Sequence, residues 1–94
     1  MTQYAIICID KPGSADIRLA NRAAHLECLK ALGDRLVLAG PFLSEDGEAM
    51  QGSLLVIDFD DRAAVDAFLA AEPYALAGLF ESVTVRRYKK VLPA

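Results

Sequence analysis

The chain contains a single histidine, His25. Arg22 lies three residues before it, and Arg18 lies four residues before Arg22. Residues with this spacing share one stripe of a helix. Histidine exchanges protons near neutral pH more readily than any other side chain, and a guanidinium binds a carboxylate through two parallel hydrogen bonds. The three residues therefore predict general acid–base chemistry on a small anionic substrate, with His25 moving the proton.

Two acidic residues, Asp10 and Glu72, are candidates for the carboxylate that orients the imidazole. A carboxylate hydrogen-bonded to one ring nitrogen fixes the tautomer and leaves the other nitrogen free to move a proton. The sequence does not choose between the two acids. By default, Asp10 would be a turn residue and Glu72 a helix stop, while Arg18 and Arg22 would be solvated or paired with nearby acids.

The composition describes one small domain with much apolar surface to bury: 94 residues are 54% hydrophobic, with a mean hydropathy of +0.29. A net charge of −3 and a pI of about 5.0 argue against a nucleic-acid partner. The one basic run, residues 86–90, divides its charges between the two faces of a strand. We therefore expect a solvated edge strand there rather than a nucleic-acid surface.

Cys8 and Cys28 form no CxxC pair, and no second histidine is present to complete a zinc site. Both fit buried apolar positions in a protein of a reducing compartment. The N-terminus lacks the basic segment of a signal peptide, and no apolar run approaches the roughly 20 residues that cross a bilayer. We expect a cytoplasmic protein without metal, cofactor or membrane partner.

Hydrophobic runs and turn residues predict strands over 4–9, 36–39, 52–59 and 80–91, with a polar loop over 44–51. A first helix is expected from Ser14 or Asp16 to Gly33, and a second from Asp60 or Asp61 to the break at Glu72. Gly40 and Pro41 are expected to close the second strand. The apolar positions with helical spacing in the first helix are Leu19, Leu26, Leu29 and Leu32.

The order βαββαβ is the ferredoxin-like α+β arrangement, an antiparallel sheet with two helices on one face. Its path gathers Asp10, the start of the first helix, Gly40 and Pro41, and the segment 72–74 at one end of the sheet. His25 lies about 13 Å along the helix from that end, and its side chain leans back toward it. We expect Tyr74, Gly40 and Pro41 to line a substrate pocket there.

The runs at residues 4–9 and 54–57 lack the polar alternation of a strand with one solvated face. Both faces of these strands are therefore expected to be covered. The two helices cover one face, and a second copy of the same sheet is the simplest cover for the other. We expect a homodimer or a higher homo-oligomer.

A series of short motifs follows the predicted elements in order. They are Asp10, Arg22-Ala23-Ala24-His25-Leu26, Ala39-Gly40-Pro41, Gly52-Ser53, Glu72-Pro73-Tyr74 and Ala77-Gly78. In this order and spacing the chain resembles the YciI-like family (YCII-related domain) over nearly its whole length. The family commonly has Asp-Pro-Tyr where this chain has Glu72-Pro73-Tyr74, so the carboxylate arm is one methylene longer here. Either Glu72 or Asp10 therefore remains a candidate partner of His25.

The resemblance implies a dimeric α+β barrel with a histidine/aspartate-centred site, and His25 matches the family histidine. One similar branch is a dehydrochlorinase acting on a chlorinated hydroxyquinol, and muconolactone-type isomerases are more distant relatives in fold. Since fold alone does not establish function, the resemblance implies only that a lyase or isomerase without a cofactor is the first hypothesis. In this first hypothesis, the catalytic residues are His25, as the general acid or base, and Asp10 or Glu72, which orients it. Arg22 and Arg18 bind the anionic group of the substrate.

Two other functional classes compete with this enzyme. In a non-catalytic dimeric module that binds a small molecule or accompanies another protein, His25 would only form a hydrogen-bonding wall of the pocket. A cofactor-independent oxygenase of the dimeric-barrel type is a third interpretation. It receives little support from a chain with no Trp, 3 Tyr and 4 Phe, because such sites tend to be rich in aromatic residues.

Overall fold

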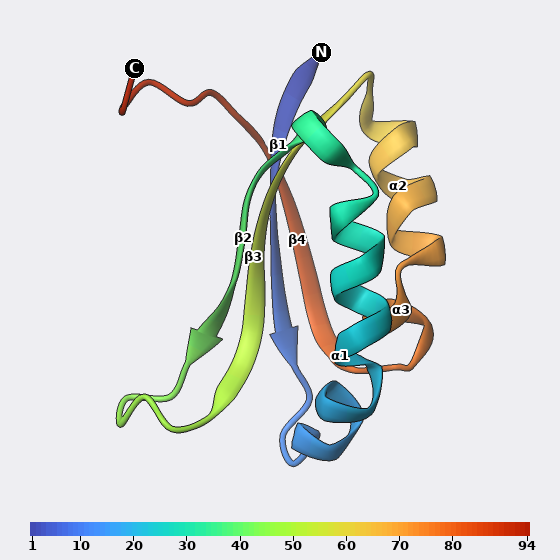
Figure 1. Ribbon diagram of the computed structural model, residues 1–94, viewed down its shortest axis with the longest axis vertical. Coiled ribbons are helices and arrows are strands. Elements are labelled where there is room, and N and C mark those ends of the chain that lie inside the picture. Colours follow the sequence, from blue (N-terminus) through green and yellow to red (C-terminus); the bar gives the residue numbers. More distant parts are fainter.

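The computed structural model describes residues 1–94 as one sheet with helices on one of its faces (Figure 1). The strands form because their residues are apolar and in part β-branched, as in the central strand with three isoleucines. The elements are β1 (Thr2–Asp10), α1 (Ala15–Lys30), a 3₁₀ turn (Gly33–Arg35), β2 (Leu36–Leu43), β3 (Met50–Phe59), α2 (Arg62–Ala71), α3 (Pro73–Leu76) and β4 (Phe80–Tyr88).

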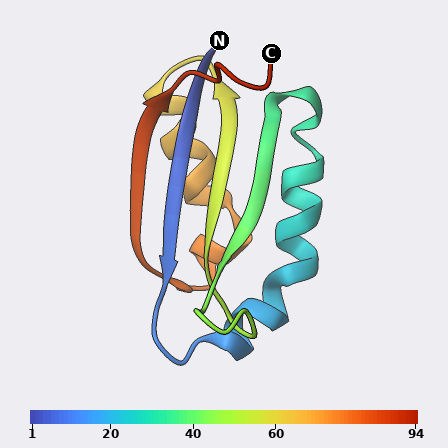
Figure 2. The ribbon, with the colours of Figure 1, turned by 90° about the vertical axis from the view of Figure 1, so that its left-hand side faces the viewer.

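The four strands are antiparallel in the order β2-β3-β1-β4, so β1 and β3 occupy the centre (Figure 2). This order and the βαββαβ path confirm the predicted ferredoxin-like α+β fold. The basic run lies on and just beyond β4, which is an edge strand as expected. None of the helices combines the length and the apolar character that crossing a bilayer requires.

Five predicted strand ends were wrong, and two of them belong to the first strand, which runs from Thr2 to Asp10 rather than over 4–9. The second strand continues through Gly40 and Pro41 to Leu43, because β2 is an edge strand and an edge tolerates a residue without a backbone N–H. The third strand begins at Met50, where it pairs with Leu43. The last strand ends at Tyr88 rather than at residue 91, since its partner there is Gln3, close to the first residue of β1.

The helix ends follow local chemistry. Ser14 and Asp61 occupy the N-cap positions of α1 and α2, and the Asp61 carboxylate accepts a hydrogen bond from Ala64 N. The first helix ends at Lys30, before the predicted stop at Gly33, which has a φ of 58° and lies in the 3₁₀ turn. Glu72 interrupts the second helix as predicted, because the residue before a proline avoids the helical conformation.

The core lies between the sheet and the helices. Its fully or nearly fully buried members are Tyr4, Ile6, Cys8, Leu29, Leu55, Ile57, Phe59 and Val65. Gly52 lets β3 approach β1 closely, because a Cβ there would lie 2.4 Å from the carbonyl oxygen of Cys8. Leu19 was wrongly expected to be on the apolar face of α1, for it is 75% exposed.

Candidate active site

A cavity of about 190 Å³ lies between α1 and the strands β2 and β3. Side chains from α1, β2, β3 and α3 form its wall, so all four elements must be in place before it exists. The lining residues are Arg18, Arg22, His25, Leu26, Leu29, Ala39, Gly40, Pro41, Met50, Ser53, Leu55 and Tyr74. Of the segments predicted to gather at one end of the sheet, residues of α1, β2 and α3 line the cavity, whereas Asp10 does not.

His25 lines this cavity and forms a buried pair with Glu72, which does not itself line the cavity. The Nδ1 atom of His25 contacts Glu72 Oε1 through a short hydrogen bond, and both residues are at most 5% exposed. The other carboxylate oxygen, Oε2, accepts a hydrogen bond of 3.0 Å from Ala75 N at the start of α3. Since the carboxylate is held at both oxygens, it fixes the imidazole and leaves Nε2 as the free ring nitrogen.

Asp10 lies beside Arg18 and not beside His25. The Arg18 guanidinium donates to both Asp10 oxygens, at 2.7 and 3.0 Å, and Nη2 also donates to Ser53 Oγ at 3.0 Å. Burial acts to lower the pKa of Arg18, but the hydrogen bond and charge of Asp10 outweigh it and raise that pKa. Arg18 is thus a buried, paired cation rather than a solvated one.

Tyr74 connects the two polar pairs. Its ring stacks on the His25 imidazole, with centroids 3.9 Å apart and planes inclined by 15°. The Arg18 Cζ atom lies 4.7 Å from the centre of the same ring, within the range of a cation–π contact. The sequence Glu72-Pro73-Tyr74 makes this possible because Pro73 begins α3 and places Glu72 and Tyr74 on adjacent parts of one short turn.

Arg22 is the one cation of the cavity wall without an anionic partner. It is exposed, and no salt bridge or hydrogen bond joins its side chain to the rest of the chain. Since Arg18 is already bound by Asp10, Arg22 is the guanidinium available to an anionic ligand.

Gly40 and Pro41 line the cavity as expected, although they lie within a strand. The lining residues that were not predicted as site residues are Leu26, Leu29, Ala39, Met50, Ser53 and Leu55. Ser53 could have been suspected, because it is a polar residue directly before the apolar run 54–57. It is 2% exposed and accepts a hydrogen bond from Arg18.

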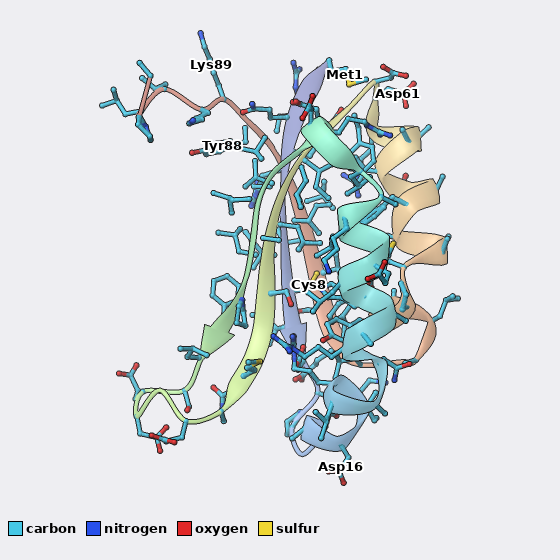
Figure 3. All side chains as sticks on the ribbon, viewed as in Figure 1. Met1, Cys8, Asp16, Asp61, Tyr88 and Lys89 are labelled. Carbon is cyan, nitrogen blue, oxygen red and sulfur yellow. The ribbon has the colours of Figure 1, made fainter.

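The two cysteines differ in burial, because Cys8 is buried as expected whereas Cys28 is only partly buried. Cys8 is fully buried between the sheet and α1 (Figure 3). Burial raises the pKa of its thiol to about 12, and the charges of Glu72 and Asp10 act in the same direction. The thiol is therefore neutral and unreactive at physiological pH. No group of three or more His, Cys, Asp or Glu residues has the geometry to hold a metal ion.

The sequence matches a known family and several of its members. The profile of the YCII-related domain covers residues 2–89. Protein YciI of Escherichia coli O6:H1 is 38% identical over 95 aligned residues, which cover 94% of this chain and 97% of that protein. An uncharacterized protein of Haemophilus influenzae is 36% identical with the same coverage.

One similar solved structure is the 5-chloro-2-hydroxyhydroquinone dehydrochlorinase of Burkholderia phenoliruptrix in complex with 2,5-dihydroxybenzoquinone. It has a TM-score of 0.86 and 34% identity, and the match covers 93% of both chains. An antibiotic biosynthesis monooxygenase has a TM-score of 0.59 and 18% identity, covering 97% of this chain and 99% of its own, a likeness that shows the fold alone. The family profile and the relatives cover nearly the whole chain, and the chain belongs to the YCII-related domain family.

Proposed function

We propose that this protein is a cytoplasmic lyase or isomerase that works without a cofactor on a small, anionic, aromatic-derived substrate. The observation that carries the proposal is the buried His25–Glu72 pair beside a cavity with a free cation, Arg22. A general base uses such a carboxylate partner, because the carboxylate keeps the proton on Nδ1 and stabilises the imidazolium formed in the reaction.

The proposed reaction begins when Nε2 of His25 removes a proton from the bound substrate. The electron pair left behind moves into the conjugated ring or toward a carbonyl oxygen. In an isomerisation, the imidazolium returns the proton to another atom of the substrate. In an elimination, the leaving anion departs with its bonding electron pair, and His25 later releases the proton to water. Glu72 remains ionised throughout and does not receive the proton.

Arg22 is the proposed anchor for the negative charge of the substrate. Its guanidinium is free and lies in the cavity wall one turn of α1 from His25. Arg18 also lines the cavity, but two of its N–H groups already donate hydrogen bonds to Asp10. Arg18 is therefore less able than Arg22 to bind a carboxylate of the substrate. We therefore assign Arg22 the main binding role and place Asp10 with Arg18 as its support rather than as a partner of His25.

The similar dehydrochlorinase, 34% identical over 93% of both chains, supports an elimination on a hydroxylated ring. Loss of hydrogen chloride requires a base for the proton and a route for chloride to leave with its electron pair, and the first of these is what His25 supplies. We therefore choose 5-chloro-2-hydroxyhydroquinone as the first substrate for a direct assay.

The test is turnover of this compound by the wild-type protein and by the variants His25→Ala and His25→Gln. Removal of a general base lowers a rate by roughly 10²- to 10⁴-fold, so both variants should lose turnover. Both variants should remain folded by circular dichroism, although His25→Ala should melt at a lower temperature because it leaves Glu72 buried without its partner. Arg22→Met should chiefly raise KM, because it removes binding rather than proton transfer.

Unfolding of both His25 variants would show that the histidine is structural and would remove the main support for an enzyme. Turnover that survives in a folded His25 variant would contradict the proposed base. Ligand binding without turnover by the wild-type protein would favour the non-catalytic binding module.

We also propose that the active form is a homodimer in which two sheets pack face to face. The face of the sheet opposite the helices carries Ile7, Ile9, Leu38 and Leu54, of which Ile9 is 41% and Leu38 47% exposed. The register places Ile7 beside Leu54, so these side chains form one continuous apolar surface. Such a surface marks an interaction site. Solved neighbours of the antibiotic biosynthesis monooxygenase type share this fold.

Sedimentation of the wild-type protein should give the mass of a dimer. Leu38→Glu places a charge in the proposed interface and should shift the equilibrium to monomers, whereas the exposed-helix variant Leu19→Glu should not. A wild-type protein that sediments as a monomer at micromolar concentration would contradict the proposal.

A further inference from the structure

Tyr74 is buried to 1% exposure, yet it lines the cavity beside His25. Its hydroxyl lies beside the Arg18 guanidinium, whose charge and side-chain hydrogen bond both act to lower the pKa of Tyr74. A guanidinium carries donors only, so the hydroxyl oxygen accepts from Arg18 and the hydroxyl proton is left for another acceptor. That proton is available to a ligand or solvent in the cavity that Tyr74 lines.

The phenol ring is held in one position by three contacts. The imidazole of His25 stacks on it at 3.9 Å, the Arg18 guanidinium packs on it at 4.7 Å, and the edge of Phe80 meets it with centroids 6.2 Å apart. Arg18 is itself fixed by Asp10 and Ser53. The direction of the hydroxyl is consequently set before any ligand arrives.

The surroundings of the phenol favour the protonated form and a negatively charged partner. Burial raises the pKa of Tyr74 above its ordinary value, while the guanidiniums of Arg18 and Arg22 act in the opposite direction and are outweighed. At neutral pH the group is a hydrogen-bond donor. The same guanidiniums make an oxyanion the acceptor that fits best between them.

We propose that the hydroxyl of Tyr74 donates a hydrogen bond to an oxyanion of the bound ligand, next to the guanidinium of Arg22. The ligand class this selects is a planar enolate or phenolate, in which one oxygen faces Tyr74 and Arg22 while the reacting carbon or hydroxyl faces Nε2 of His25. The inference rests on the proposed function and extends it from anion binding to recognition of one particular oxygen.

The role follows from the chemistry that His25 would perform. Removal of a proton from a hydroxylated ring leaves negative charge that collects on oxygen. A donor already aimed at that oxygen stabilises the charge without reorganisation, and one such donor is worth roughly 10²- to 10³-fold in rate. Tyr74 is then a group that touches substrate, and its ring has a second use in holding the imidazole plane.

The test is the affinity of 2,5-dihydroxybenzoquinone, the ligand of the similar dehydrochlorinase, for the wild-type protein and for Tyr74→Phe. This compound is a vinylogous acid that carries charge on oxygen at neutral pH, and its visible absorption reports binding. Phenylalanine keeps the stack on His25 and the contact with Arg18 and removes only the hydroxyl. A lost hydrogen bond to a charged acceptor weakens binding roughly tenfold to a hundredfold, and the absorption maximum of the bound ligand should move.

Tyr88→Phe is the matched control, because it removes the same hydroxyl from an exposed tyrosine. Tyr88 lies at the opposite end of the molecule from Asp16 and the start of α1 (Figure 3). It should bind as the wild type does. Equal affinity and equal spectra for Tyr74→Phe and the wild type would overturn the inference, even if His25→Ala has lost turnover and the proposed function stands. Absence of binding to the wild-type protein would overturn the ligand class, whereas the role of His25 is judged by turnover alone.

Discussion

The helices α1 and α2 hold equivalent places in the two halves of the fold and lie on the same face of the sheet (Figure 1). The two helices bury different kinds of side chain. The buried residues of α1 are Arg18, His25 and Leu29, whereas α2 buries Val65, with Phe68 and Leu69 partly covered. One helix stabilises the fold with apolar surface, and the other places two ionisable groups where water is excluded.

This difference indicates where function lies. Burying a polar or charged group is unfavourable unless it finds partners, and each buried group of α1 has one: Asp10 and Ser53 for Arg18, and Glu72 for His25. Such a network is seldom needed for folding, because a well-packed apolar replacement is often as stable. An α1 with this face is therefore best understood as the helix of the reactive site.

The largest expected effect is from breaking the network on α1 at Arg18. The variant Arg18→Met leaves Asp10 charged and unpaired in a buried place, which costs about 3–5 kcal/mol of unfolding free energy. Urea unfolding measures the loss. The double variant Asp10→Leu with Arg18→Met should regain most of the stability, because no unpaired charge remains.

Arg22→Met is the matched control on the same helix and should change the unfolding free energy by less than about 0.5 kcal/mol, as for other exposed substitutions. If Arg18→Met were as stable as Arg22→Met, the Asp10–Arg18 pair would not be a structural part of the site.

The apolar helix is tested by Val65→Ala, which should cost about 2 kcal/mol through lost burial and the cavity left behind. Val65 is fully buried and does not line the reactive cavity. Ligand affinity at a temperature where the variant is folded should therefore equal that of the wild type. An affinity that falls together with stability would show that the two helices are not separate in their roles.

A smaller effect concerns the pH dependence of stability. The pKa of Cys8 is raised to about 12 from its ordinary value of 9.0, first by burial and then by the charges of Glu72 and Asp10. The unfolded thiol ionises above pH 9 while the folded thiol does not, so the stability contribution is complete below pH 9 and is lost as the pH rises toward 12.

The loss attributable to Cys8 should be about 1.4 kcal/mol for each pH unit in that window. Comparison of the wild type with Cys8→Val, which cannot ionise, isolates this contribution from that of the lysines and tyrosines. Identical pH profiles between 9 and 11 would contradict the assigned burial of the thiol.

Most of the fold could be predicted because hydrophobic periodicity records which residues lie in each strand and helix. The errors occurred where an edge or a partner strand decided the boundary. Pro41 is a strand breaker in the centre of a sheet, but it is tolerated in β2 because that strand has a neighbour on one side only. No pattern within residues 36–43 reveals that position.

The site could be predicted as a set of residues but not as a set of contacts. The sequence brought His25, Asp10 and Glu72 to one end of the sheet, yet it could not tell which acid reached the imidazole. That choice depends on the start of α3, which holds Glu72 at its N-cap beside His25. The stack of Tyr74 on His25 was also beyond the sequence, since by default a tyrosine at this place is a core residue with its hydroxyl at the rim.

We would first record the NMR spectrum of the His25 ring, which needs no substrate and contains one histidine signal. We expect a proton on Nδ1, seen downfield and protected from exchange by Glu72. That signal should move upfield and exchange faster in Glu72→Gln, because a neutral amide oxygen is a weaker acceptor than a carboxylate, and it should stay unchanged in Asp10→Asn. A wild-type ring protonated only at Nε2, or an Nδ1 proton that is unchanged in Glu72→Gln and lost in Asp10→Asn, would contradict the assigned His25–Glu72 pair.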